Sequence, residues 1–200
     1  YKGRVQGGLK GAEVIFEKNT VMGTESVLLS SVLASGITTI LNAAQEPEVD
    51  DLILLLTKMG AIIERVTDRT IRVEGVTTLH GASHEILPDR NEAATFAIAA
   101  AVTRGDLLIK NTKPSDMTAL LAKLEKIGVA FESGKNSLRV WALPDQEFKS
   151  VSIETSPHPG FMTDWQQPIC VLLTQAVGVS LVHDTIYINR FEFTKELNRM

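Results

Sequence analysis

One pattern of residues returns along this chain at a period near 70 residues. Its copies span Ser31–Asn42, Ala100–Asn111 and, in a looser form, Thr174–Asp184. The glycines that match between successive copies lie 69 and 73 residues apart. Self-similarity at a fixed period indicates repeated supersecondary units that stack on one another, so it constrains the fold more than any local motif does.

A second signature repeats inside the first two copies. An apolar run ends in a glycine at Gly60 and again, 68 residues later, at Gly128. Each glycine comes two residues after a lysine, Lys58 or Lys126, and precedes two short runs rich in apolar and β-branched residues. This order predicts a helix with a left-handed glycine at its carboxyl end, followed by a hairpin.

The first unit is predicted to have the order β-α-β-α-β-β. Short β-branched runs predict strands, apolar residues at helical spacing predict helices, and Pro47 with the acids around it suits a first helical turn. The predicted elements are a strand at Ala12–Glu17, a helix at Glu25–Ala34 stopped by Gly36, a strand at Ile37–Leu41, a helix from Glu46 to Lys58, and hairpin strands at Ala61–Arg65 and Thr70–Glu74.

The second unit repeats this order, and a third unit begins it again. The second is predicted as a strand at His84–Leu87, a helix at Asn91–Val102 closed by Gly105, a strand at Leu107–Lys110, a helix from Pro114 to Lys126, and strands at Val129–Glu132 and Leu138–Trp141. The third is predicted as a strand at Lys149–Glu154, a helix from about Trp165 to Ala176 with Pro168 in its first turn, a strand at Val179–Val182 and the start of a helix at Glu196–Met200. Since its closing hairpin is missing, we expect the chain to be a fragment of a longer protein.

The predicted fold class is α/β, built from repeated β-α-β-α-β-β units. Such a unit buries little surface alone and stacks on copies of itself. Its helices, of which Leu52–Leu56 is an example, are apolar nearly all round. This favours an inside-out α/β barrel type of architecture, in which helices are buried between outward-facing sheets.

Composition excludes several functional classes. The 200 residues are enough for one large domain or two small ones, and a net charge of −4 argues against nucleic-acid binding. No run of 18 apolar residues predicts a membrane span, and the segment at 1–8 lacks the apolar core of a signal peptide. A single cysteine, Cys170, excludes an internal disulfide and fits the reducing cytoplasm. The four histidines lack metal-ligand spacing, so we expect no metal and no bound cofactor.

Two candidate sites lie at predicted helix starts in the first two units. The segment Lys18–Thr24 is a Gly/Thr-rich turn that could offer free amides to an anion, and a plain strand-to-helix turn is the alternative. The segment Pro88–Glu92 is polar as well. Its simpler interpretation is a helix cap with an ion pair on the helix surface.

Two further candidates lie in the third unit. Pro157–Pro168 holds three prolines, a histidine and two aromatic residues around Asp164, which a rigid turn would place at a helix start. That carboxylate could take a proton from a substrate hydroxyl, or it could only cap the helix. In Asn189–Phe191, Arg190 could pair with a phosphate, a carboxylate or a neighbouring glutamate. Cys170, within an apolar stretch, is predicted to be a core thiol and not a nucleophile.

Several motifs together resemble the enolpyruvyl transferase family, in its branch that acts on UDP-N-acetylglucosamine and not in its shikimate branch. They are Asn42–Glu48, Leu87–Glu92, His158–Gln166, and Asn189–Phe191 with Glu196–Met200. The resemblance implies two domains of three units each, with buried helices and an active site between the domains. Residues 1–87 would be the last unit of the first domain, and residues 88–200 one full and one truncated unit of the second.

The resemblance also implies a reaction. Its members transfer the enolpyruvyl group of phosphoenolpyruvate to the 3′-hydroxyl of UDP-N-acetylglucosamine and release phosphate, the first committed step of peptidoglycan synthesis. These two substrates and the remaining units of the parent chain would be the partners, with possible self-association of the fragment through its uncovered surfaces. The family's catalytic Cys or Asp loop does not fall in this segment, so we expect the fragment to be inactive alone.

Residue roles follow from the same resemblance. Lys18, Asn19, Thr20 and Val21 match the segment that holds the uridine and its diphosphate, although Thr20–Thr24 departs from the commoner Ser-Val-Gly-Ala-Thr type. Asp164 matches the carboxylate that contacts the sugar 3′-hydroxyl and acts as the base, and Ile186 matches a backbone contact to substrate. Asp89 and Arg90 would lie beside the cleft, and Arg190 matches an arginine without an assigned role. The alternatives are a non-catalytic sugar-nucleotide-binding or scaffold protein of the same fold, and a shikimate-pathway relative.

Overall fold

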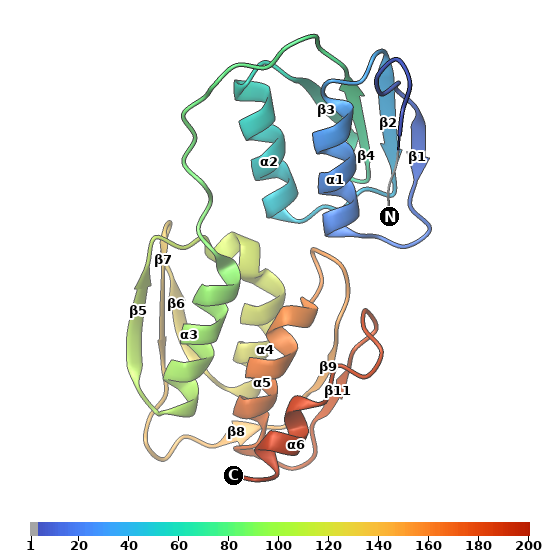
Figure 1. Ribbon diagram of the computed structural model, residues 1–200. Helices are drawn as coiled ribbons and strands as arrows, with labels where there is room; N and C mark the ends of the chain where they lie inside the picture. Colours follow the sequence, from blue (N-terminus) through green and yellow to red (C-terminus); the bar gives the residue numbers. More distant parts are fainter. Residues whose placement is uncertain (1–3) are drawn as a thin grey trace. The chain divides into compact units, whose positions relative to one another are not determined.

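The computed structural model describes residues 4–200, which fold into two compact units (Figure 1). The first unit reaches to Leu87 and the second begins at Pro88. Each unit has its own hydrophobic core, and each is described here by itself. Across residues 4–200, none of the helices has the length and apolar character that crossing a membrane requires.

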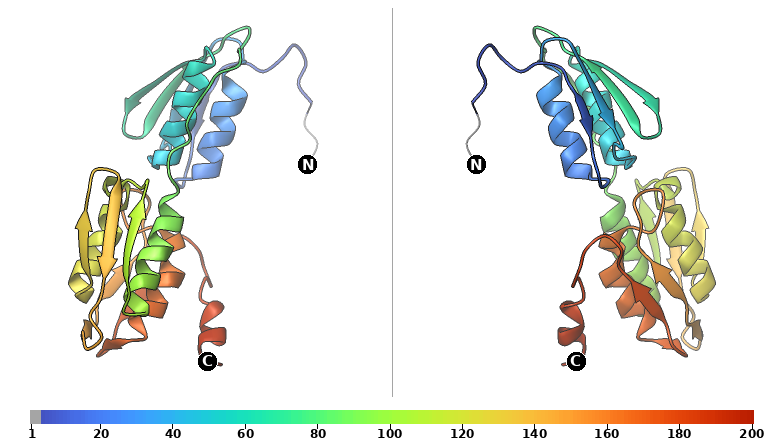
Figure 2. Two further views of the ribbon diagram at one scale, coloured as in Figure 1. Left: turned by 90° about the vertical axis from the view of Figure 1, so that its left-hand side faces the viewer. Right: turned by 90° about the vertical axis from the view of Figure 1, so that its right-hand side faces the viewer.

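The first unit has the predicted order β-α-β-α-β-β. Its elements are β1 (Glu13–Ile15), α1 (Val21–Ser31), β2 (Ile37–Leu41), α2 (Pro47–Lys58), β3 (Ile62–Thr67) and β4 (Thr70–Glu74). The sheet order is β1-β2-β4-β3, with β1 parallel to β2 and the other two pairs antiparallel. Both helices lie over one face of this sheet (Figures 1 and 2).

The core of the first unit lies between that sheet face and the two helices. Ile40, Ile71 and Val73 point from the sheet into it, and Leu28 of α1 and Leu56 of α2 meet them. The opposite side of α2 is open, since Leu54 is 56% exposed. Within the described residues α2 therefore packs against one sheet only, and the predicted burial between two sheets is not seen in this unit.

Helix ends follow the predicted glycine pattern in two of four places, and Gly36 lies five residues after Ser31, the last residue of α1. Gly60 after α2 and Gly128 after its counterpart in the second unit have φ near +100° and +98°, as a left-handed carboxyl cap requires. After the helix that ends at Val102, the left-handed residue is Arg104, with φ +55°, and not Gly105. The prediction that Gly105 closes that helix is therefore only partly right: its N–H bonds the Ala100 carbonyl at 2.8 Å, but the turn is made one residue earlier.

The second unit starts with a helix and not with a strand. Its elements are α3 (Arg90–Val102), β5 (Asp106–Lys110), the 3-10 turn η1 (Pro114–Met117), α4 (Thr118–Ile127), β6 (Ala130–Ser133) and β7 (Ser137–Trp141), and the sheet order is β5-β7-β6. The predicted strand at His84–Leu87 is wrong. The His84 imidazole instead contacts Asp51 at 3.0 Å and Lys58 at 3.1 Å, so side-chain bonds to α2 hold this segment in an irregular path.

The third copy of the pattern is broken into shorter pieces. They are β8 (Phe148–Lys149), β9 (Ser152–Glu154), the 3-10 turn η2 (Thr163–Trp165), α5 (Gln166–Leu173), β10 (Ala176–Val177), β11 (Leu181–His183) and α6 (Phe193–Leu197). The strand predicted at Lys149–Glu154 is divided into β8 and β9, and the one predicted at Val179–Val182 is found only in part, as β11. The helix predicted to reach Ala176 ends at Leu173, and β10 follows it. β10 pairs in parallel with β8, and β11 with β9. Pro168 is the third residue of α5, in the first turn as predicted.

Helix α3 is the centre of the second unit's core. It packs against β5 and β7 on one side and α5 on another. Its buried alanines, among them Ala94, Ala97 and Ala101, have small side chains that permit this close approach. At one end of the core Trp165 is 1% exposed and meets the Phe161 ring edge-on at 5.6 Å. The segment around Asp164 is therefore anchored by a large buried ring.

Candidate functional site

The segment Lys18–Val21 connects β1 to the amino end of α1. Thr20 is the helix cap, and its hydroxyl accepts the Gly23 N–H at 3.2 Å. This cap takes up one first-turn amide and leaves those of Val21 and Met22 for another acceptor. Lys18 is exposed just before the cap. The segment therefore offers a positive side chain beside a helix amino end, which is the arrangement that favours an anion.

Asn19 has a structural role in this segment, because its side chain is bonded to backbone and not directed to a ligand. Its side-chain amide donates to the carbonyls of Asn42 and Ala43, at 3.3 and 3.1 Å. The Asn42 amide in turn donates to the Phe16 carbonyl at 2.9 Å, from a left-handed backbone at φ +56°. Asn19 thus ties the start of α1 to the end of β2, and it positions the segment between them.

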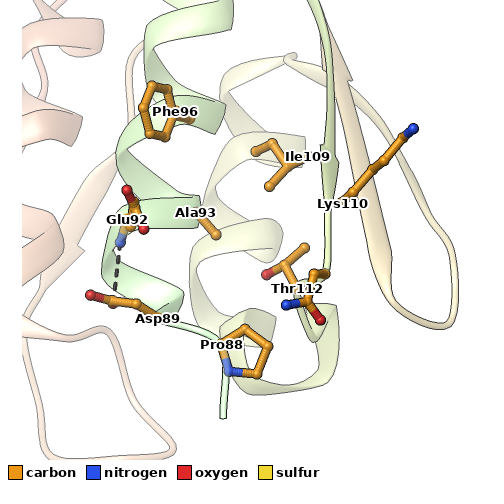
Figure 3. Close-up of a pocket in the computed structure, with 9 residues that line it drawn as sticks. Pro88, Asp89, Glu92, Ala93, Phe96, Ile109, Lys110 and Thr112 are labelled. Carbon is orange, nitrogen blue, oxygen red and sulfur yellow. Dashed lines mark hydrogen bonds between the residues drawn. The ribbon is translucent and has the colours of Figure 1, made fainter. Parts of the chain in front are cut away.

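The second unit has a hollow of about 350 Å³ at the matching place, between the start of α3 and the end of β5 (Figure 3). Asp89 caps α3, because its carboxylate accepts the N–H groups of Asn91 and Glu92 at 2.7 and 3.2 Å. This confirms the capping interpretation of Asp89. The residues that line the hollow are Pro88, Asp89, Glu92, Ala93, Phe96, Ile109, Lys110, Asn111 and Thr112.

Arg90 lies inside the unit and not on the helix surface. It is 1% exposed, and its Nη1 donates to the Asp116 carbonyl at 3.2 Å and lies 3.1 Å from the His158 Nδ1. Its guanidinium also lies 5.7 Å from the centre of the Trp165 ring. The predicted position on the helix surface is therefore wrong for Arg90, which joins η1 to the loop before Asp164.

Asp164 and Arg190 form an ion pair on the surface of the second unit. Arg190 Nη2 lies 2.6 Å from Asp164 Oδ1, and the two side chains are 27% and 45% exposed. Neither η2 nor α5 has a side-chain cap bond, so Asp164 does not act as the helix cap that was the alternative. With Tyr187 and Ile188, the pair lines an open hollow of about 370 Å³. The carboxylate is thus at a surface that a ligand can reach.

A second carboxylate, that of Asp184, is linked to this ion pair through Thr163. Thr163 Oγ1 accepts from Arg190 Nη1 at 2.7 Å and donates to Asp184 Oδ2 at 2.6 Å. The other Asp184 oxygen accepts the N–H groups of Ile186 and Tyr187, both at 2.9 Å. The Ile186 N–H is therefore already used within the protein, and of its two backbone polar groups only the carbonyl is left for another partner.

The pKa of Asp184 lies below its ordinary value. Partial burial raises it, but hydrogen bonds from the Thr163 side chain, the Tyr187 and Ile186 amides and the Thr155 side chain together lower it more. Asp184 is therefore an anion at neutral pH, and it can only accept hydrogen bonds.

The candidate residues recur at one position of the repeat. The helix caps Thr20 and Asp89 are 69 residues apart, like the glycines of the pattern. Asn42, Asn111 and Asp184 each stand six residues after a pattern glycine. In every copy, the candidate site is thus the junction between the start of a helix and the end of the strand that follows it.

The structure places the predicted residues in three groups. Asn19, Thr20 and Val21 with Lys18 form one group in the first unit. The second unit brings Asp164, Arg190 and Ile186 into one network, while Asp89 and Arg90 belong to the start of α3. Sequence reasoning missed the roles of Asp184 and Thr163. Asp184 could have been found from the repeat, because it occupies the position of Asn42 and Asn111.

Cys170 is half-buried and outside the hydrophobic core, so the prediction of a core thiol is wrong, while its environment still disfavours a nucleophilic thiolate. Burial raises its pKa to about 11, so the thiolate is scarce at neutral pH. Among residues 4–200, no three His, Cys, Asp or Glu side chains gather closely enough to hold a metal ion.

Comparison with known proteins places the chain in a family. The model of the family described as EPSP synthase (3-phosphoshikimate 1-carboxyvinyltransferase) matches residues 2–200. The chain belongs to this family. The match extends over both units.

Curated relatives carry a more specific name within the family. A UDP-N-acetylglucosamine 1-carboxyvinyltransferase of Acidobacterium capsulatum is 49% identical over 193 residues, which are 96% of this chain and 44% of that protein. The relative from Koribacter versatilis is 48% identical and covers the same shares, and the one from Shewanella denitrificans is 45% identical over 100% of this chain and 47% of its own length. These names confirm the resemblance inferred from the motifs. The chain spans less than half the length of these relatives.

A solved structure supports the fold. The enolpyruvyl transferase NikO from Streptomyces tendae matches with a TM-score of 0.81 at 22% identity, over 88% of this chain and 42% of that one. Likeness at this identity shows the α/β fold of the family. The described residues form open sheets and no closed one.

Proposed function

We propose that a protein of the relatives' length that contains this chain transfers the enolpyruvyl group of phosphoenolpyruvate to the 3′-hydroxyl of UDP-N-acetylglucosamine, as a step of peptidoglycan synthesis. The observation that carries the proposal is identity of 45–49% over nearly the whole chain to relatives named for that reaction. Both candidate groups, at Lys18–Val21 and around Asp164, lie within the matched residues.

In this proposal the first unit holds the nucleotide. The free amides at the start of α1 and the Lys18 ammonium bind the diphosphate, because the helix dipole and the lysine both favour an anion there. Asn19 keeps this helix start in place through its bonds to the end of β2. Thr20 acts mainly as the cap, while Val21 contributes its amide.

Asp164 then serves as the base for the sugar hydroxyl. Arg190 engages Asp164 Oδ1, so Oδ2 remains to accept the hydroxyl proton. The hydroxyl oxygen forms a bond to the enolpyruvyl carbon, its proton goes to Asp164, and the bond from that carbon to the phosphate oxygen breaks to release phosphate. The Ile186 carbonyl contacts the same sugar.

The complete protein is also proposed to have the architecture that the repeat implies. Residues 1–87 would be the last unit of a first domain, and residues 88–200 would start the second domain. Further units would cover the open sides of the helices, such as the face of α2 that carries Leu54, and so produce helices buried between sheets in an inside-out barrel. The cytoplasmic location remains a prediction.

Ligand binding by the complete protein tests this function. Calorimetric titration is expected to show binding of UDP-N-acetylglucosamine and none of shikimate 3-phosphate. Lys18→Ala is expected to weaken binding about tenfold, through the loss of one charge-assisted contact. Lys135→Ala, in the exposed turn between β6 and β7, is the matched control and should leave affinity unchanged. Binding of shikimate 3-phosphate alone would instead support the shikimate branch.

A non-catalytic sugar-nucleotide-binding or scaffold protein is the second candidate. It would bind UDP-N-acetylglucosamine in the same titration and release no phosphate from phosphoenolpyruvate. Phosphate release is the measurement that separates the two, because a free oxygen of Asp164 can accept a hydrogen bond from a sugar hydroxyl in either protein.

A further inference from the structure

The Asp184 carboxylate joins two segments that carry the predicted substrate contacts of the second unit. Its Oδ1 fixes the turn after β11 by accepting the N–H groups of Ile186 and Tyr187, both at 2.9 Å. Its Oδ2 accepts the Thr163 hydroxyl at 2.6 Å, from the η2 turn that contains Asp164. One side chain therefore contacts both Ile186 and the residue that precedes Asp164.

The link from Asp184 to Asp164 has a fixed direction. An ionised carboxylate only accepts, so the Thr163 hydroxyl must give its proton to Asp184. The lone pairs of that hydroxyl then face Arg190, whose Nη1 donates to it at 2.7 Å. The other terminal nitrogen of Arg190 donates to Asp164 Oδ1 at 2.6 Å. Asp184 thus orients Arg190 through Thr163, and Arg190 orients Asp164.

Contacts of the neighbouring residue Thr185 fix the backbone beside Asp184. Thr155 is fully buried, its hydroxyl accepts the Thr185 N–H at 2.9 Å, and the Thr185 hydroxyl donates back to the Thr155 carbonyl at 2.6 Å. On the outer side, the Arg190 guanidinium lies 5.0 Å from the centre of the Tyr187 ring. At one end of the network Asp184 is bonded to backbone N–H groups, and at the other end Arg190 packs on an aromatic ring.

We infer that Asp184 is a positioning residue, which holds Asp164 and the Ile186 carbonyl in the geometry that the sugar hydroxyl requires. This role rests on the proposed function, since it assumes that Asp164 acts on that hydroxyl. Misplacement of a reacting group by a small distance lowers the rate of the chemical step much more than it weakens substrate binding.

Substitutions along the network in the complete protein test the role. Asp184→Asn keeps an oxygen for the two backbone N–H groups but presents an NH₂ donor to Thr163, which reverses the direction of that bond. Thr163→Val keeps the shape and removes the hydroxyl. Each variant is expected to lower kcat for phosphate release about 10- to 100-fold, with KM for UDP-N-acetylglucosamine changed less than about threefold. Thr163→Ser should recover most of the kcat that Thr163→Val loses.

Two further measurements separate positioning from a general loss of structure. The double variant Asp184→Asn with Thr163→Val should lose no more activity than the more affected single variant, because the two residues act through one chain of contacts. Glu154→Gln, on the neighbouring strand β9 with an exposed carboxylate beside His183, is the matched control and should keep full activity. Thermal unfolding of every variant shows which of them fold. If Asp184→Asn does not fold, the comparison of kcat between Thr163→Val and Thr163→Ser tests the inference instead.

The inference is overturned if Asp184→Asn or Thr163→Val folds and keeps kcat within about twofold, or if the two losses multiply in the double variant. It is also overturned if Glu154→Gln loses as much activity as Asp184→Asn. A different outcome addresses the proposed function: if the unaltered protein releases no phosphate from the two substrates, the proposed function fails. An active unaltered protein with unaffected variants contradicts only the role of Asp184.

Discussion

Two aspartates that Thr163 and Arg190 link, Asp164 before α5 and Asp184 after β11, have different surroundings in this chain. Asp164 is 45% exposed and meets one arginine, whereas Asp184 receives four hydrogen bonds that outweigh the effect of its partial burial. The first arrangement leaves an oxygen for a ligand, and the second uses both oxygens inside the protein. The substrate role proposed for Asp164 and the positioning role proposed for Asp184 agree with this difference.

The lowered pKa of Asp184 predicts an acid-dependent contribution to stability. Its folded pKa lies below the ordinary value of 3.8, so the ionised group stabilises the folded unit above that pH, and the stabilisation is lost as pH falls through the folded pKa. Asp184→Asn is expected to lower the free energy of unfolding by about 1 kcal/mol near neutral pH, since the group is partly exposed and screened.

Urea unfolding at about pH 6 and about pH 2 measures this contribution, with Glu154→Gln as the exposed-carboxylate control. The deficit of Asp184→Asn should shrink toward the lower pH. A deficit that stays constant or grows would show that the ionised carboxylate is not the source of the stabilisation.

The single cysteine gives a second prediction about one side chain. The Cys170 pKa of about 11, against an ordinary 9.0, means that the thiolate population near pH 8 is about 100-fold smaller than that of a free cysteine. Alkylation by iodoacetamide is expected to be slower by about that factor in the folded chain. The rate should rise with pH until about 11, and unfolding in urea should restore the ordinary rate. An alkylation rate in the folded chain equal to that in urea would contradict the burial of this thiol.

At the scale of elements, both units have a candidate site where a helix begins beside the end of the following strand, and a side-chain cap fixes that helix start. The helix cap is Thr20 in the first unit and Asp89 in the second. Removing either cap oxygen leaves one or two first-turn amides without their acceptor, which costs about 1 kcal/mol. Thr20→Ala should therefore loosen α1, and Asp89→Ala should loosen α3.

Amide hydrogen exchange localises these effects, because each variant should speed exchange in the first turns of its own helix. Thr20→Ser and Asp89→Asn, which keep a capping oxygen, should restore protection. Ser26→Ala, on the exposed side of α1, is the control. Equal exchange in the Ala and the Ser or Asn variants would contradict the assigned caps.

Elements whose residues carry their own local signal were predicted well. The strands Ile37–Leu41 and Thr70–Glu74 are found as predicted, because β-branched residues there favour a pleated, half-buried surface. The strand predicted at His84–Leu87 is absent since His84 bonds to Asp51, 33 residues away. No local pattern reports such a contact.

In the candidate site too, contacts between residues far apart in the sequence could not be predicted from local patterns. Asp164 was identified because a rigid, proline-rich turn surrounds it in the sequence. The burial of Arg90 could not be predicted, because His158 lies 68 residues from it and becomes its neighbour only in the folded unit. The role of Thr163 depends in the same way on Asp184, which lies 21 residues further along the chain.

At the scale of the whole molecule, the repeat organises both fold and function. One arrangement, a helix start beside a strand end, carries the proposed anion site in the first unit and a carboxylate network in the second. Copies of one structural unit have thus taken different side chains at equivalent positions, as Asn42 and Asp184 show. In the proposed enzyme, the first copy binds the nucleotide and the other supports chemistry on the sugar.

The most direct test of this account is an assay of the complete protein with phosphoenolpyruvate and UDP-N-acetylglucosamine, in which phosphate release and product mass are followed together. We expect phosphate and an enolpyruvyl sugar nucleotide in equal amounts, and a loss of kcat of about 100-fold or more in a folded Asp164→Asn variant, because the base for the hydroxyl proton is removed. Phosphate release with shikimate 3-phosphate in place of the sugar nucleotide, or full activity of Asp164→Asn, would contradict the account.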